Sequence, residues 1–184
     1  MLDFKVRNKW SKYLLTFLVL FTSCSRDVGN QQKKAEIISS FLDFYQKSIL
    51  KKDSIILLDN ASNYDYPNCL DNFLKDKRSN EFNKKDISKT KTFVWDKNEI
   101  PNAKLIKNSA IPDYRTPAGW RNFNKMYGEG YYVMSKPIVS NDLKYITFYI
   151  AYYCGDRCGY GQFALYKKTN NGWEIVEKYC DWIS

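Results

Sequence analysis

Residues 144–153 read KYITFYIAYY, and nearly all of these side chains are β-branched or aromatic. Such residues favour β-strands because they pack well on a pleated surface. Similar runs precede this stretch at residues 131–139 and follow it at residues 162–168 and 173–179. The links between the runs are short, and TNNG at residues 169–172 is a strong hairpin signal. The last third of the chain is therefore predicted to be an antiparallel β-meander.

Residues 35–52 (AEIISSFLDFYQKSILKK) carry a helical pattern. Apolar side chains recur there at spacings of three and four, which predicts an amphipathic helix whose apolar stripe joins the core. The stripe comprises Ile37, Ile38, Phe41, Leu42, Tyr45 and Ile49.

A second helix is predicted within residues 116–130. Thr116 can cap it, Pro117 suits its first position, and Gly128 suits its end. Three aromatic side chains fall on one face, which is expected to pack against the sheet. They are Trp120, Phe123 and Tyr127.

The intervening segments carry weaker signals. Residues 59–69 are rich in turn formers and predict a loop, and residues 70–92 predict short helices. Phe93 to Trp95 suggests the first strand and Ala103 to Ile106 a second. Together the patterns predict a single α+β domain over residues 35–184, with N-terminal helices packed on one face of the meander.

The 184-residue chain contains no histidine. This excludes Ser-His-Asp and Cys-His nucleophile systems, histidine-ligated zinc and the two-histidine-one-carboxylate iron site. Any catalysis would have to use carboxylates, Lys, Tyr or Cys. We expect no metal and no cofactor.

The N-terminus has the layout of a secretory signal. Residues 1–12 are basic, residues 13–21 are apolar apart from Thr16, and Thr22-Ser23-Cys24 follows. The apolar run is about half of the ~20 residues that a membrane-spanning helix needs. A plain signal peptide with an incidental cysteine is one reading of this pattern.

The other reading rests on a resemblance. Thr22-Ser23-Cys24 after the apolar run resembles the lipobox of bacterial lipoproteins, with Phe21 where that family usually has leucine. The resemblance implies that residues 1–23 are a signal peptide, that Cys24 receives a diacylglyceryl thioether and an N-acyl chain such as palmitate, and that residues 24–34 form a tether. Such a protein sits on a cell membrane through its lipid, facing the periplasm or the cell surface, with the outer membrane favoured.

Removal of residues 1–23 would lower the formal charge from +9 to +6. The lysine pairs that remain are scattered along the chain, so nucleic acid is not expected as a partner. They are Lys33-Lys34, Lys51-Lys52, Lys84-Lys85 and Lys167-Lys168.

Four cysteines remain once Cys24 is lipidated, and two of them lie in YYCGDRCGYG at residues 152–161. Outside the cytoplasm paired cysteines are usually oxidised. Cys154 and Cys158 are predicted to staple a turn, with Gly155, Gly159 and Gly161 supplying positive-φ geometry. A second pair, Cys69 with Cys180, is left open.

Three other readings of this loop are weaker. A thioredoxin-type redox site has two residues between its cysteines and a helix after them, whereas here there are three residues and a strand. A four-thiolate zinc site lacks its paired short spacings. A phosphate-binding loop would lead into a helix.

The stretch from Gly130 to Ser184 resembles small lipoproteins of Gram-negative bacteria, and this resemblance implies no activity. A fold-level comparison is to helix-plus-curved-sheet domains of the nuclear transport factor 2 type. Because such domains include both binding modules and enzymes, the fold leaves the function open.

Two functions are compatible with the sequence. The first is a non-catalytic binding module of the cell envelope, whose partner is a protein or an envelope polymer, with an inhibitor or immunity protein as a narrower version. The second is an enzyme that uses carboxylates and tyrosines in a sheet-lined pocket, for which Glu129 and Asp156 are the candidate acids. A buried carboxylate with a raised pKa would favour the enzyme, and an open aromatic patch would favour the binding module.

Overall fold

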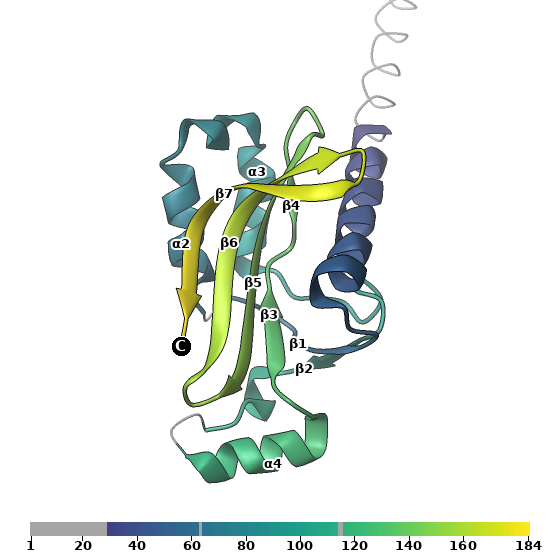
Figure 1. Cartoon of the computed structure of the whole chain (residues 1–184). Coiled ribbons are helices and arrows are strands. Elements are labelled where there is room, and N and C mark those ends of the chain that lie inside the picture. Colours follow the sequence, from purple (N-terminus) through teal and green to yellow (C-terminus); the bar gives the residue numbers. More distant parts are fainter. Residues whose placement is uncertain (1–28, 63, 114–115) are drawn as a thin grey trace, which may run out of the picture. The chain divides into compact units, whose positions relative to one another are not determined.

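The structure, a computed structural model, describes residues 29–62, 64–113 and 116–184 (Figure 1). They belong to two units, one ending at Ile37 and one running from Ile38 to Ser184. The predicted signal peptide and Cys24 lie outside the described residues. The described part of the first unit is α-helical, so the end of the predicted tether, residues 29–34, is helical rather than irregular. In the part of the chain that is described, no helix is long and apolar enough to span a membrane.

The second unit is an α+β domain built on one mixed sheet. The described strands are β1 (Ile55–Leu58), β2 (Ala103–Ile106), β3 (Tyr131–Met134), β4 (Ile138–Val139), β5 (Tyr145–Gly155), β6 (Cys158–Thr169) and β7 (Gly172–Ile183). Their order in the sheet is β2-β1-β3-β5-β6-β7, and β4 also pairs with β5. Strands β3 to β7 pair antiparallel, which confirms the predicted meander, while β1 lies parallel to both β2 and β3.

The predicted first strand at Phe93 to Trp95 is wrong, because this segment is irregular. Its aromatic side chains are buried as anchors instead. The Trp95 backbone N–H donates to the Asp59 carbonyl over 2.7 Å, and its indole Nε1 donates to the Met134 carbonyl over 3.0 Å. The strand beside β2 is β1, which the sequence analysis did not predict.

The predicted strand at residues 131–139 is divided into β3 and β4. Pro137 between them has no N–H to give to a ladder. Ser135 is buried and bridges the gap: its backbone N–H donates to the Tyr149 carbonyl, and its Oγ accepts from the Tyr149 N–H, both over 3.0 Å. Strand pairing with β5 therefore continues past the break.

The edge strand β7 contains two β-bulges. Phe163 pairs with Cys180 but Ala164 pairs with Lys178, and Leu165 pairs with Glu177 but Tyr166 pairs with Ile175. Each shift leaves one β7 residue, Tyr179 or Val176, without a partner opposite.

From Ile38 onward, the predicted N-terminal helix lies on one face of the sheet. Residues 38–44 are α-helical and continue as the π-helix η1 (Tyr45–Leu50), which ends at Lys51 in the left-handed conformation. Phe41 packs edge-on against Phe148, Tyr166 and Trp173, with ring centroids 5.1–5.3 Å apart. Ile49, predicted as part of the apolar stripe, is exposed and lies in the last turn of η1, one residue before the helix ends at Leu50.

The remaining helices come from the middle of the chain. They are α2 (Tyr66–Leu74), η2 (Lys77–Glu81), α3 (Lys84–Lys89), η3 (Thr90–Thr92), η4 (Asn108–Ala110) and α4 (Pro117–Tyr127). The loop predicted over residues 59–69 is wrong from Tyr66 onward, because α2 begins there. Pro67, which reads as a turn former in the sequence, occupies a position in the first turn of this helix, where proline is tolerated. Phe73 of α2 packs against Phe163, on the sheet face opposite to Phe41. Helices therefore cover both faces of the sheet, and the prediction that they pack on one face is wrong.

Helix α4 is confirmed with its predicted ends. Thr116 Oγ1 accepts from the Gly119 N–H, Pro117 begins the helix, and Gly128 ends it with a φ of 96°. Trp120 stacks on Tyr131 with ring centroids 6.1 Å apart. Trp120 and Phe123 are buried, as expected for the face that packs on the sheet.

Candidate functional site

Three tyrosines from adjacent strands lie side by side on the sheet face that carries Phe148. The register pairs Tyr132 of β3 with Tyr152 of β5, and Tyr152 with Tyr160 of β6. Neighbouring ring centroids are 4.7 and 5.8 Å apart. We call Tyr132, Tyr152 and Tyr160 the tyrosine row.

The tyrosine row becomes more open toward the edge of the sheet. Tyr132 is 4% exposed, Tyr152 is half-buried and Tyr160 is 40% exposed. The next residue in register is Ile183 of the edge strand β7, which is 87% exposed. The inner end of the row is therefore part of the core, and its outer end is accessible from solvent.

Polar groups adjoin the tyrosine row on the same face. Gln162 lies two residues beyond Tyr160 on β6, and its Nε2 donates to the hydroxyls of Tyr45 and Tyr166 over 3.3 and 3.1 Å. Burial raises the pKa of both Tyr45 and Tyr166, and the hydroxyl of each affects the pKa of the other. The amide of Gln162 thus holds two neutral hydroxyls together beside the row.

A lysine lies over the inner end of the row. Lys52 Nζ is 5.7 Å from the ring centroid of Tyr132 and 5.2 Å from that of Tyr152, within the range of a cation–π interaction. Its position follows from the helix end, since Lys51 turns the chain with a φ of 52°. Lys52 itself remains exposed.

A hydrogen bond to the backbone fixes the position of the Tyr152 side chain. Its hydroxyl donates to the backbone carbonyl of Glu129. Gly130, with a φ of 74°, allows this approach, because a Cβ at that position would lie 2.8 Å from the Tyr152 hydroxyl. Desolvation raises the pKa of Tyr152 and that of Tyr132. Both hydroxyls therefore stay protonated at neutral pH and can donate as well as accept hydrogen bonds.

The two nominated acids, Glu129 and Asp156, both have exposed side chains. Two carboxyls of the described residues have a clearly displaced pKa, and in both it is lowered. Hydrogen bonds from Arg78 hold the pKa of Asp76 at about 2, and a hydrogen bond from Ser140 lowers that of Asp142. These carboxyls are charged at neutral pH and do not act as proton donors there.

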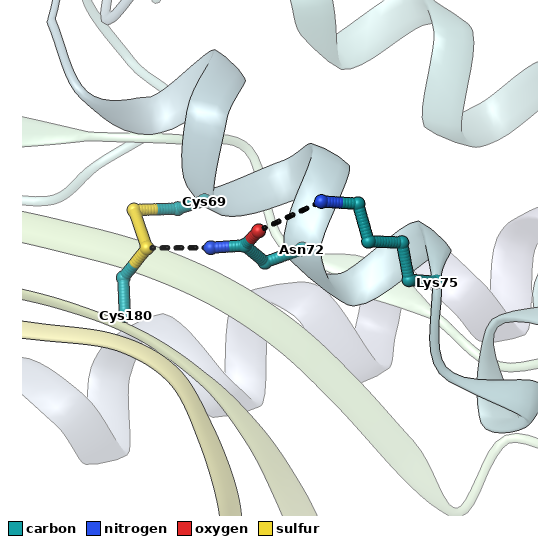
Figure 2. Close-up of a disulfide and its surroundings, with 4 residues drawn as sticks. All are labelled: Cys69, Asn72, Lys75 and Cys180. Atoms are coloured by element: carbon teal, nitrogen blue, oxygen red, sulfur yellow. Dashed lines mark hydrogen bonds between the residues drawn. A yellow bond between two sulfur atoms is a disulfide. The ribbon is translucent and has the colours of Figure 1, made fainter.

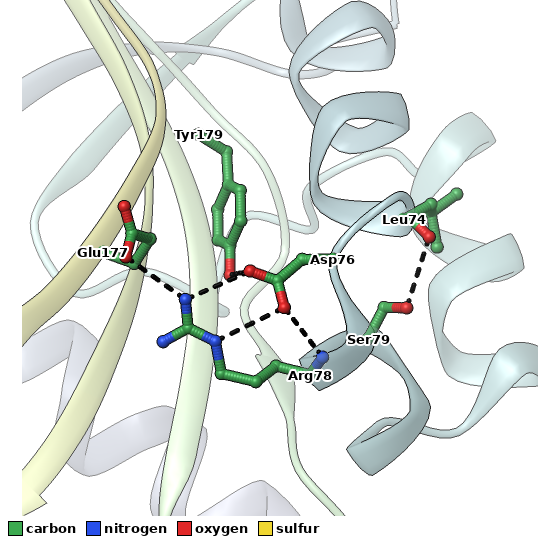
Figure 3. A network of polar contacts seen from close by, with 6 residues as sticks. All are labelled: Leu74, Asp76, Arg78, Ser79, Glu177 and Tyr179. Carbon is green, nitrogen blue, oxygen red and sulfur yellow. Dashed lines mark hydrogen bonds and ion pairs between the residues drawn. The ribbon is translucent and has the colours of Figure 1, made fainter.

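Asp76 belongs to a network that fastens the end of α2 to β7 (Figure 3). Arg78 Nη2 lies 3.1 Å from Asp76 Oδ2 and 3.2 Å from Glu177 Oε2, and the Tyr179 hydroxyl donates to Asp76 Oδ2 over 3.1 Å. Each of these contacts joins two residues of the protein. The network is therefore a structural clamp.

A disulfide joins the same two elements. Cys69 of α2 and Cys180 of β7 have Cα atoms 5.5 Å apart (Figure 2). Asn72 Nδ2 lies 3.8 Å from Cys180 Sγ, and Asn72 Oδ1 accepts from Lys75 Nζ over 3.4 Å. Cys69 is buried in a helix, not in the polar loop that the sequence predicted.

The second disulfide closes the hairpin between β5 and β6. Cys154 and Cys158 have Cα atoms 5.1 Å apart, so the predicted pair and the pair that the sequence left open both lie at disulfide distance. Among the described residues, no group of three or more Cys, Asp or Glu side chains could hold a metal ion.

The prediction that the hairpin glycines supply positive φ angles is wrong. Gly155, Gly159 and Gly161 do not have positive φ angles. Instead, Gly161 and Gly159 lie beneath the Trp182 ring, and a Cβ at Gly161 would be 2.6 Å from Trp182 Cε2. These two glycines make room for an indole.

No model of a known protein family, curated protein or solved structure matches this chain. The resemblances noted in the lipobox and in residues 130–184 therefore stay predictions. The tyrosine row was not predicted either, because its members become neighbours only once the strand register is known. The signal in the sequence was the recurrence of tyrosine in three successive strand segments.

Proposed function

We propose that the protein is a lipoprotein of the bacterial cell envelope that acts as a non-catalytic binding module, with the tyrosine row as its contact surface. Its partner is a protein or an envelope polymer. One observation carries the proposal: the row ends in a tyrosine that is 40% exposed beside an isoleucine that is 87% exposed. Tyrosine is enriched at binding surfaces because it offers a large apolar ring and a polar tip.

The location is supported by the N-terminal sequence. A basic segment, an apolar run and Thr22-Ser23-Cys24 favour lipidation of Cys24 and retention at a membrane, the outer membrane being the favoured one. Two cysteine pairs at disulfide distance are compatible with an oxidising compartment. A fold of the nuclear transport factor 2 type is part of the proposal, supported by a helix that lies on one face of a bulged sheet.

Lipidation is tested by Cys24→Ala. We expect this variant to lose fatty-acid labelling and to leave the membrane fraction or to accumulate unprocessed. A Cys24→Ala protein that is still labelled and still sediments with membranes would contradict the lipoprotein assignment.

The contact surface is tested by replacing Tyr160 with a photo-crosslinking phenylalanine analogue in growing cells. The matched control is the same analogue at Tyr127, a half-buried tyrosine of α4 that also has a lysine, Lys104, 4.8 Å over its ring. We expect a cross-linked envelope component from position 160 and none from position 127. Absence of any cross-link from position 160 would refute the row as a contact surface.

A further inference from the structure

We infer that the Cys154–Cys158 disulfide is a thiol–disulfide exchange site, at which a thiolate from another molecule attacks the sulfur of Cys158 and releases that of Cys154. The other disulfide, Cys69–Cys180, stays closed under the same conditions. The inference goes beyond the proposed function, because it concerns the tip of the β5–β6 hairpin and does not require the tyrosine row to bind a partner. It depends on the accessibility of the two disulfides and on what holds the hairpin together.

The two disulfides differ in accessibility. Cys158 is exposed, Cys154 is half-buried, and the two turn residues between β5 and β6 are exposed as well. Cys69, in contrast, is 1% exposed, and the amide of Asn72 lies 3.8 Å from the sulfur of its partner Cys180. A thiolate must reach one sulfur of a disulfide in order to attack it, and exposed disulfides are the ones that exchange readily. The hairpin disulfide is therefore the one that is open to attack.

Exposure also selects which of the two hairpin sulfurs is attacked. Tyr153 pairs with Gly159 and Gly155 pairs with Cys158, so Cys154 is the residue of a β-bulge that has no partner opposite. Cys158 thus lies in the ladder with an exposed side chain, whereas Cys154 is half-buried. The attacking thiolate reaches Cys158, and the sulfur of Cys154 is the leaving group.

The exchange is a balanced transfer of two electrons from a thiol reductant. Its thiolate forms a bond to Cys158 Sγ while the Cys154–Cys158 bond breaks, and the electron pair of that bond leaves on Cys154 Sγ, which takes up a proton. If the reductant is a dithiol, its second thiolate then attacks its own sulfur in the mixed disulfide and releases Cys158 as a thiolate. The dithiol becomes a disulfide, and the hairpin pair becomes two thiols.

The hairpin does not depend on its disulfide. Strands β5 and β6 pair without interruption from Tyr145 with Lys167 to Tyr153 with Gly159. Gly159 is also fastened to the end of the chain, because its N–H donates to the Ser184 carbonyl over 3.3 Å and its carbonyl accepts from the Ser184 N–H over 3.0 Å. Reduction removes only the small constraint of a short loop. The two thiols therefore remain neighbours, and the bond can close again.

The test exposes the oxidised, lipidated full-length protein in detergent to two kinds of thiol. One arm uses glutathione, a small monothiol, and the other uses reduced thioredoxin, a protein dithiol, so the arm that responds identifies the source of the thiol. After acid quenching, free thiols are alkylated and the disulfides are mapped by mass spectrometry. We expect Cys154–Cys158 to open at least about tenfold faster than Cys69–Cys180 in one or both arms. The inference is overturned if the hairpin bond opens in neither arm, or no faster than Cys69–Cys180.

A thioredoxin variant that retains only its attacking cysteine identifies the attacked sulfur, because it stops the reaction at the mixed disulfide. We expect the trapped peptide to join thioredoxin to Cys158, and a link to Cys154 would overturn the assignment of the attacked sulfur. The matched control is the double variant Cys154→Ala with Cys158→Ala, which should unfold cooperatively and trap no thioredoxin. A trapped adduct at Cys69 or Cys180 of this control would show that the second disulfide exchanges too, against the inference.

Reversibility is measured on the protein whose hairpin disulfide has been reduced. After removal of the thiol, oxidised glutathione should restore the Cys154–Cys158 bond, and tryptophan fluorescence should remain that of the folded protein throughout. New bonds from either hairpin cysteine to Cys69 or Cys180 would show that the hairpin does not keep its two thiols together, and a reversible exchange site would be ruled out.

Discussion

Removing the two disulfides one at a time should destabilise the protein by very different amounts. In the chain-entropy treatment the loss grows with the logarithm of the loop that the disulfide closes. Cys69 and Cys180 are 111 residues apart, which gives about 4.8 kcal/mol at 25 °C. Cys154 and Cys158 are 4 residues apart, which gives about 1.9 kcal/mol.

The perturbations are the double variants Cys69→Ala with Cys180→Ala and Cys154→Ala with Cys158→Ala. Alanine avoids leaving a polar group at Cys69, which is buried. Because domains of this size have unfolding free energies of only about 5–15 kcal/mol, the first variant should lose a large share of its stability. The second should lose a minor share and serves as the matched control.

Urea unfolding followed by tryptophan fluorescence measures the difference. With a denaturant dependence of about 1–3 kcal/mol per M, a gap of about 2.9 kcal/mol separates the two midpoints by about 1–3 M. Equal midpoints would refute the reasoning, and so would a lower midpoint for the variant without the short-range disulfide. Adding a reductant to the wild type should bring its midpoint below that of either variant.

Three further changes test other contacts. Trp120→Ala should destabilise the domain by about 3–5 kcal/mol in thermal or urea unfolding, because the indole stacks on Tyr131 in the core; unchanged stability would mean that this face of α4 is not packed. Gly161→Ala should destabilise by about 1–3 kcal/mol, since its Cβ would lie 2.6 Å from a ring carbon of Trp182; a neutral result would show that the indole can move away freely. The pKa of Asp76 is lowered from 3.8 to about 2, so its stabilising contribution is full above pH ~4 and is lost as the pH falls toward 2. Asp76→Asn should therefore reduce the dependence of the unfolding free energy on pH between about 4 and 2. The same pH dependence in the variant and the wild type would contradict the clamp.

The sequence predicted the part of the fold that has a local pattern. Residues 144–153 alternate between two buried faces, so Phe148 meets Phe41 on one side while Tyr149 meets Tyr66 on the other. Such strands and their hairpins are visible in the sequence because the neighbouring residues determine them. The caps of α4 are visible for the same reason, because Thr116 and Gly128 act on backbone groups only a few residues away.

The parts that were missed depend on distant partners. Strand β1 is only Ile55–Leu58, and it exists because β2 and β3 pair with it in parallel from later in the chain. Tyr66 begins a helix although turn-forming residues precede it, since its ring is buried against Tyr149 and Phe163. The tyrosine row could not be predicted for the same reason, because it needs the register of three strands at once.

The two bulges of β7 have a consequence for self-association. This strand is the last in the sheet, and Ile175 and Val176 on it are 46% and 44% exposed. A long, regular and apolar edge would be a template for another copy, which could add its own strand and begin a fibril. The residues inserted at Val176 and Tyr179 break the even repeat of backbone groups that such a template requires. A second copy that approached this edge would thus meet an interrupted row of backbone groups between Ile175 and Cys180.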